Sequence, residues 1–158
     1  MKILYFCNDF KYEQFLQSLK MREKAIERLK EMGIRPSEQR IVILEYLLGH
    51  RTHPTVEAIY SDLSQKMPTL SKTTVYNTLK LLEENNAILE LTIDKHNSHF
   101  DGYVDPHSHF MCKKCGKIID VDQPEATMCC EPYEARFVIQ ETEIYYRGLC
   151  SDCIKDKQ

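Results

Sequence analysis

The sequence predicts an α+β fold, with helices in the N-terminal half and short strands after them. Two patterns support this order. Apolar residues recur with helical spacing in successive segments up to residue 86, and short strand-like segments follow them. The chain has 158 residues, of which 42% are hydrophobic, so it can bury the core of one domain or of two small ones.

Three or four helices are expected in the first half of the chain. Ala25, Leu29 and Met32 recur at i, i+4 and i+7, and Gly33 ends this segment. Each of the next three segments follows a residue whose side-chain oxygen can cap a helix N-terminus. These capping residues are Ser37, Thr55 and Ser71. Residues 1–21 are interpreted as an extension that can form its own short amphipathic helix before Met21.

A β-hairpin is predicted after the last of these helices. Segments 87–93 and 97–104 are strand-like and are joined by a turn at Asp94–Asn97. A winged helix, which is a variant of the helix-turn-helix, has this order of elements, with helices first and a β-hairpin after them. We therefore predict a winged-helix domain over residues 22–103.

A small α/β domain is predicted over residues 104–158. Segments 107–112 and 117–122 read as strands on either side of a CxxC turn. Segment 124–135 reads as a short helical crossover, and segment 136–150 holds one or two strands before a second CxxC.

Two CxxC pairs predict a structural zinc site. Each CxxC turn points both sulfurs at one ion, and two pairs complete a tetrahedron for Zn(II). Such a closed site leaves no open coordination position, which argues for a structural rather than a catalytic ion. A thioredoxin-like redox pair and buried thiols are the alternatives. The four cysteines are Cys112, Cys115, Cys150 and Cys153, whereas Cys7, Cys129 and Cys130 are read as ordinary small apolar residues.

A second metal site is predicted from histidines and aspartates. His107 and His109 form an HxH pair, and on a strand both imidazoles share one side and can bind one ion. Asp120 ends the paired strand, and Asp101 lies shortly before His107. These ligand types together suit Fe(II), Mn(II) or Zn(II). Surface histidines and a turn aspartate are the alternative, and His53 is a further candidate that spacing alone does not connect to His107.

Charge and hydropathy limit the partners and the compartment. The net charge of −3 gives no sign of a nucleic-acid partner, so any DNA binding must rest on a local basic face. No apolar run approaches the roughly 20 residues that span a bilayer, and no signal peptide is recognised. We expect a cytoplasmic protein without a membrane partner, in which seven cysteines indicate metal or redox chemistry rather than disulfides.

Four stretches and the final CSDC resemble the ferric uptake regulator (Fur) family. The stretches are GIRPSEQR (33–40), THPTVEAIY (52–60), SKTTVYNTLKLLEENN (71–86) and HFDGYVDPHSHFMCKKCGKIIDV (99–121). They occur in family order within residues 22–154. The resemblance implies a homodimeric, metal-dependent transcriptional repressor that is not an enzyme. It further implies an N-terminal winged helix for double-stranded DNA and a C-terminal dimerisation domain.

The resemblance also implies ligands for two metals. The four cysteines would bind structural Zn(II), and one regulatory Fe(II) or Mn(II) ion would link the two domains, so that only one relative orientation is stable when it is bound. The regulatory ligands would be His53, Asp101, His107, His109 and Asp120.

Within the family, the ligand set resembles the peroxide-sensing PerR branch. Iron sensors usually carry Glu at the position of Asp120, and zinc sensors commonly carry Cys at the position of Asp101. The resemblance implies that hydrogen peroxide reacts at Fe(II) and that the imidazole of His53 or His107 is oxidised. The repressor would then leave DNA, whereas Mn(II) would support DNA binding without this reaction.

The helix that begins after Ser71 is the expected DNA-reading element. Opposite its apolar stripe it carries groups for hydrogen bonds, thymine methyl contacts and phosphate, although a solvated face is the alternative. These residues are Lys72, Thr73, Tyr76, Asn77 and Lys80. By resemblance Tyr76 and Asn77 read bases, and Arg35 enters an A·T-rich minor groove of a palindromic operator.

Three other functions are weighed against the peroxide-responsive repressor. The first is an iron-responsive regulator of the same family. The second is a hydrolytic metalloenzyme, which needs an open metal position and a general base that the histidine–aspartate set does not offer. The third is a zinc-stapled interaction module, which predicts one ion per chain instead of two.

Overall fold

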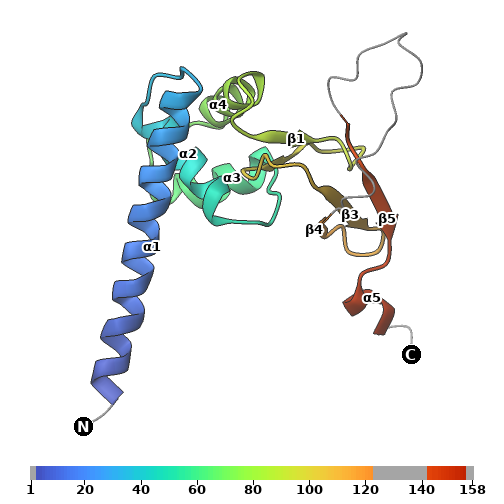
Figure 1. Cartoon of the computed structure of the whole chain (residues 1–158), viewed down its shortest axis with the longest axis horizontal. Helices are drawn as coiled ribbons and strands as arrows, with labels where there is room; N and C mark the ends of the chain where they lie inside the picture. The colour runs from blue at the N-terminus through green and yellow to red at the C-terminus, as the bar shows by residue number, and fades with distance from the viewer. Residues whose placement is uncertain (1–2, 123–141, 156–158) are drawn as a thin grey trace. The chain divides into compact units, whose positions relative to one another are not determined.

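The computed structural model describes residues 3–122 and 142–155. Helices come first and small sheets follow, so the predicted α+β class is confirmed (Figure 1). The chain divides into two compact units. The helical unit comprises residues 1–92 and 96–104, and the C-terminal unit comprises residues 93–95 and 105–158. The domain limits at residues 21 and 103 stay predictions.

Four helices build most of the helical unit. They are α1 (Ile3–Glu31), α2 (Glu38–Gly49), α3 (Val56–Ser64) and α4 (Lys72–Glu84). The three capping predictions are confirmed, because the side chains of Ser37, Thr55 and Ser71 each accept a hydrogen bond from a backbone N–H three residues later. These caps satisfy N–H groups that would otherwise lack a partner at the start of each helix.

Helix α1 differs from the expected separate short helix in the extension. It is one helix of 29 residues that passes through residue 21 without a break. No glycine or proline precedes Gly33 in the sequence, so nothing local interrupts the helix. Arg22 pairs with Glu38 and Glu45 of α2 at 2.7 and 3.6 Å, and this holds the middle of α1 in place. Its N-terminal part extends past the other helices of the unit (Figure 1).

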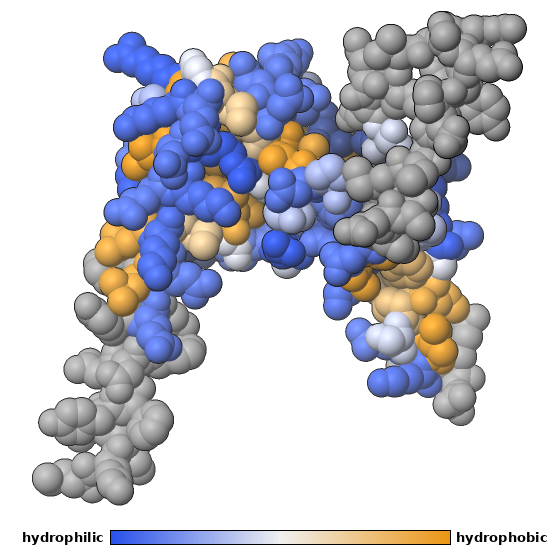
Figure 2. All heavy atoms as spheres, viewed as in Figure 1, coloured by the Kyte–Doolittle hydropathy of each residue, from blue (hydrophilic) through white to orange (hydrophobic). Residues whose placement is uncertain are grey.

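The core of the helical unit lies where the apolar faces of the helices meet. Leu29, Leu44, Ile59 and Leu79 are 0% exposed, and each comes from a different helix. Because each helix must bury its stripe against the others, these contacts fix the orientation of α4 relative to α1, α2 and α3. Hydrophilic residues cover much of the visible outer face of this unit (Figure 2).

A two-stranded sheet completes the helical unit and confirms the predicted hairpin. Strand β1 (Leu89–Leu91) pairs antiparallel with β2 (His99–Asp101), and Leu89 lies opposite Asp101. The strands are shorter than the segments predicted from the sequence. Residues 93–95, between them, group with the C-terminal unit, where Arg147 donates a hydrogen bond of 2.8 Å to the carbonyl of Ile93.

The C-terminal unit contains a three-stranded sheet in the order β4–β3–β5. Strand β3 (Ser108–Cys112) is antiparallel to β4 (Ile118–Val121) and parallel to β5 (Tyr145–Gly148), and α5 (Ser151–Lys155) follows. The predicted strands on either side of the first CxxC are confirmed. The predicted crossover at 124–135 lies outside the described residues, as do residues 136–141 of the segment that ends in β5.

Within the described ranges, no helix combines the length and the apolar character that crossing a bilayer requires.

Candidate metal centres

The four cysteines of the two CxxC pairs come together in the C-terminal unit. Their sulfur atoms lie within 4.8 Å of one another, and Cys115 Sγ is 3.8 Å from Cys150 Sγ. Cys112 ends β3, and Gly116 in the turn after it has a φ of +75°, which only glycine adopts easily. Cys150 directly precedes α5 and Cys153 lies in it. A β-turn and a helix start therefore present four sulfurs to one point, as a tetrahedral site requires.

The environment of these thiols favours a bound cation. The backbone N–H groups of Cys115 and Cys150 point at the sulfur of Cys112 and lower its pKa to about 6. Burial raises the pKa of Cys153 to about 12, because its thiolate would be desolvated beside the other sulfurs. The protein alone thus favours the thiolate at Cys112 and the thiol at Cys153. A bound divalent ion would hold both residues as thiolates, because coordinated thiols are deprotonated outright. The donor set thus fits a structural metal.

His53 and Asp101 form a buried pair in the helical unit. His53 lies in the loop between α2 and α3, and Asp101 ends β2. His53 Nε2 is 3.5 Å from Asp101 Oδ2, and the two side chains are 1% and 3% exposed. The other carboxylate oxygen, Oδ1, accepts a hydrogen bond of 2.8 Å from the backbone N–H of Tyr103. One carboxylate oxygen is thus fixed by the backbone while the second faces the imidazole.

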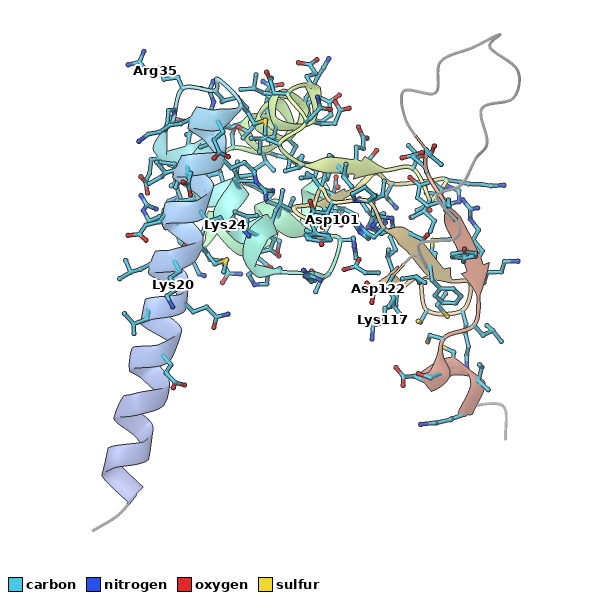
Figure 3. The ribbon with its side chains drawn as sticks, viewed as in Figure 1. Lys20, Lys24, Arg35, Asp101, Lys117 and Asp122 are labelled. Carbon is cyan, nitrogen blue, oxygen red and sulfur yellow. The ribbon has the colours of Figure 1, made fainter. Side chains whose placement is uncertain are left out.

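Two contacts hold the backbone after Asp101 in place. The guanidinium of Arg28 on α1 donates to the carbonyls of Ala87 and Gly102, and the bond to Ala87 is 3.2 Å long. Gly102 also lies directly against α2, where an added Cβ would come within 2.9 Å of the backbone of Leu47. This close approach of Gly102 to α2 leaves no room for a side chain at residue 102. Asp101 (Figure 3) therefore sits on a segment that α1 and α2 position together.

His107, His109 and Asp120 form a second group, in the C-terminal unit. Asp120 on β4 lies opposite His109 on β3 in the strand register. Asp120 Oδ1 is 3.7 Å from Nε2 of His107 and 4.0 Å from Nε2 of His109. The Nδ1–H of His107 donates to the carbonyl of Asp105 at 2.7 Å. This leaves the Nε2 lone pair of His107 directed toward the carboxylate, as metal binding requires.

Both groups combine imidazole nitrogens with carboxylate oxygens. This chemistry suits first-row divalent metals such as Fe(II), Mn(II) or Zn(II), whereas a thiolate cluster suits zinc. The chain thus offers two kinds of metal donor. The four-cysteine cluster supplies soft sulfur, and the two histidine–aspartate groups supply nitrogen and oxygen. The structure places each ligand predicted from the sequence within one of these groups.

Helix α4 presents the residues predicted to contact DNA on its exposed side. Val75, Leu79 and Leu82 are buried, and the opposite side carries exposed Lys72, Thr73, Tyr76, Asn77 and Lys80. Tyr76 is 55% exposed, and it lines a groove of about 600 Å³ between α4 and the β1–β2 hairpin. Lys72 forms an ion pair with Glu57, and both residues line this groove. Arg35, in the turn after α1, projects away from the unit (Figure 3).

Comparison with known proteins assigns the family. Residues 31–153 match the ferric uptake regulator family. The chain belongs to this family. The "Peroxide operon regulator" of Bacillus subtilis is 36% identical to it over 135 residues, covering 84% of this chain and 93% of the relative. The "Peroxide-responsive repressor PerR" of Staphylococcus aureus is 34% identical over 133 residues, covering 83% and 90%.

A solved Fur structure supports the same assignment. The Helicobacter pylori ferric uptake regulator superposes with a TM-score of 0.65 at 26% identity, covering 87% of this chain and 93% of that one. As a Fur-family member, the chain is a metal-dependent transcriptional regulator, and both relatives named above are peroxide-linked regulators by name. Fur-family regulators bind DNA and dimerise, and the hydrolytic enzyme considered from the sequence is set aside.

Some residues around these Fur-family ligands were missed by the sequence analysis. Arg28 supports the segment after Asp101, yet an arginine on an amphipathic helix carries no local sign of such a role. His99 contacts the backbone of His53, and its position two residues before Asp101 on a strand was the available signal, since such residues share a face.

Proposed function

We propose that this Fur-family regulator is a repressor that responds to hydrogen peroxide. The observation that carries the proposal is the pair of histidine–aspartate groups, with aspartate at both carboxylate positions. The five residues would bind one regulatory Fe(II) or Mn(II) ion that links the two units. They are His53, Asp101, His107, His109 and Asp120. The names of the PerR relatives support the peroxide response.

A second part of the proposal concerns the cysteines. Cys112, Cys115, Cys150 and Cys153 would bind structural Zn(II), which ties the end of β3 to α5. Four protein ligands saturate this ion, so it would have no part in sensing. The two metals would thus have separate roles, one in folding and one in regulation.

The five regulatory residues would bind the ion through lone pairs on their imidazole nitrogens and carboxylate oxygens. Fe(II) bound there would supply the reduction of peroxide. By resemblance to the PerR branch, the imidazoles of His53 and His107 would be the ones oxidised, and His107 keeps its Nε2 available through the bond from Nδ1 to Asp105. An oxidised imidazole binds the ion less well, and the link between the units would be lost. DNA affinity would fall because the two reading helices of a dimer would lose their spacing.

The DNA partner would be a palindromic, A·T-rich operator bound by a homodimer. Tyr76 and Asn77 would read bases, Lys72, Thr73 and Lys80 would contact the backbone, and Arg35 would enter the minor groove. Dimerisation is supported by exposed apolar side chains in the C-terminal unit, where α5 shows an apolar area (Figure 2). These are Ile119, Tyr146 and Ile154. The site of action would be the cytoplasm.

One experiment tests the proposed function. Gel-shift titrations on a candidate palindrome are run with the Mn(II) and the Fe(II) forms, before and after micromolar peroxide, and peptides are analysed by mass spectrometry. The Fe(II) form should release DNA and gain the mass of one oxygen atom on a peptide containing His53 or His107. The Mn(II) form should stay bound. Release without modification would refute the mechanism.

The same experiment separates the nearest alternative. An iron-responsive regulator would bind DNA with either metal and would ignore micromolar peroxide. An interaction module would contain one metal ion per chain, which metal analysis of the purified protein detects.

A further inference from the structure

Strand β2 holds the loop that contains His53 through three successive residues. The Nδ1 atom of His99 is 2.6 Å from the carbonyl oxygen of His53. The backbone N–H of Phe100 donates to the carbonyl of Pro54 at 3.0 Å. The carboxylate of Asp101 faces Nε2 of His53 at 3.5 Å. His99 and Asp101 therefore contact the same residue, one at its backbone and the other at its ring.

The backbone of His53 adopts a conformation that needs such support. Its φ is +49°, in the left-handed region that a non-glycine residue enters only at an energetic cost. Among the described residues the only other non-glycine residue with positive φ is Asn86. The surrounding structure must over-determine such a conformation for it to persist. The contacts from His99 and Phe100 fix the carbonyls of His53 itself and of the next residue, Pro54, so they hold the backbone on the C-terminal side of the strained torsion.

We propose that His99 is a positioning residue for the regulatory metal site. A carbonyl oxygen can only accept, so Nδ1 of His99 carries the proton and donates it to His53. This bond keeps the backbone of His53 at positive φ, which in turn aims its Nε2 at Asp101. His99 itself is not a ligand in this arrangement. The inference rests on the proposed function in one respect, namely that His53 binds the regulatory metal.

Substitutions at residue 99 separate the hydrogen bond from the bulk of the ring. His99→Phe keeps a ring and removes the donor. His99→Asn keeps an N–H at nearly the place of Nδ1, because both nitrogens are attached to Cγ. A matched control is His50→Phe, since Nδ1 of His50 lies 2.7 Å from the carbonyl of Tyr46 in the same kind of contact at an exposed helix end.

The first measurement is Mn(II) affinity of the zinc-loaded protein, from the electron paramagnetic resonance signal of free Mn(II). Loss of a residue that orients a metal ligand typically weakens binding about 10–100-fold. His99→Phe should lose at least about 10-fold in affinity, His99→Asn should stay close to wild type, and His50→Phe should be unchanged. Zinc content should be the same in all four proteins.

The second measurement needs no regulatory metal. In protein labelled at histidine, the three-bond coupling between HN and Hα of His53 reports φ. Wild type and His99→Asn should show the positive-φ value, and His99→Phe should not. If His99→Phe does not fold, His99→Gln replaces it, because its amide lies one bond farther from Cγ and misses the carbonyl of His53.

The outcomes are distinguishable. If wild-type protein binds zinc but no second metal, the proposed function fails, and the coupling of His53 still decides whether His99 positions it. Unchanged φ in His99→Phe overturns the inference. An affinity loss in His99→Asn as large as in His99→Phe overturns it as well, because the donor would then not be what matters.

Discussion

The Nε2 atom of His53 lies 3.5 Å from the Oδ2 atom of Asp101, with both side chains almost fully buried. One residue precedes α3 and the other ends β2, so the contact joins the helical core to the hairpin. Burying a carboxylate beside an imidazole costs free energy that a bound divalent cation would offset, because such an ion accepts both groups as ligands. The arrangement therefore fits a metal site better than a site selected for stability alone.

Asp101→Asn should weaken regulatory metal binding and leave structural zinc in place. The substitution removes the negative oxygen that hard divalent ions prefer but keeps the size of the side chain. We expect Mn(II) affinity to fall by at least about 10-fold, measured as above, with unchanged zinc content. Asp122→Asn, at an exposed position just after β4, is the charge-matched control and should bind Mn(II) like wild type.

Cys115→Ser should release zinc and unfold the C-terminal unit. Binding of structural zinc contributes about 10–16 kcal/mol of folding free energy in small domains, and three thiols cannot complete the tetrahedron. Zinc analysis and circular dichroism of the purified variant check this expectation. Cys129→Ser, outside both CxxC pairs, should retain its zinc; retention by Cys115→Ser as well would contradict the four-cysteine site.

Tyr76→Ala should reduce specific DNA binding more than non-specific binding. The side chain is 55% exposed, so its loss should not destabilise the fold, and one base contact is worth about 1–3 kcal/mol. Lys80→Ala, on the same side of α4, should instead weaken binding to all sequences. The slope of log affinity against log salt concentration should become shallower by about one released counterion. Fluorescence anisotropy on operator and scrambled DNA measures both. Equal losses on both DNAs for Tyr76→Ala would argue against base readout.

Gly102→Ala should destabilise the helical unit. Its Cβ would come within 2.9 Å of the Leu47 backbone, so α2 and β2 would have to separate. The free energy of unfolding should fall by about 1–3 kcal/mol, as overpacking usually costs. Gly49→Ala is the matched control, because a Cβ at the end of α2 meets no atom within 4 Å. This control should be neutral or slightly stabilising in urea denaturation.

Tyr46→Phe should change the alkaline stability of the protein. Burial, and then the 2.6 Å bond to Asp62, raises the pKa of Tyr46 from 10.0 to about 12. The stability that the neutral phenol contributes is therefore fully present below pH 10 and is lost as pH rises toward 12. Below pH 10, Tyr46→Phe should be less stable than wild type by about 1 kcal/mol, and the difference should shrink toward pH 12. Urea denaturation across this pH range measures it, and a constant difference would contradict the shift.

Local features of the fold were predictable because short-range chemistry decides them. Ser37, Thr55 and Ser71 cap their helices by hydrogen bonds to residues three positions away, so the pattern is visible in the sequence itself. The strands on either side of the first CxxC follow from the same kind of local pattern. Helix α1 was the exception, because the expected break near residue 21 has no glycine or proline to produce it and the helix runs through that position.

The sequence by itself determined the α+β order, the helix starts and the types of metal donor, since residue chemistry and spacing carry that information. Only the tertiary structure decided that His53 meets Asp101, that Arg28 supports Gly102 and that His99 contacts the strained backbone of His53. Those contacts join residues far apart in the chain. They depend on how the helices and the hairpin pack around a common core, and no local pattern encodes that packing.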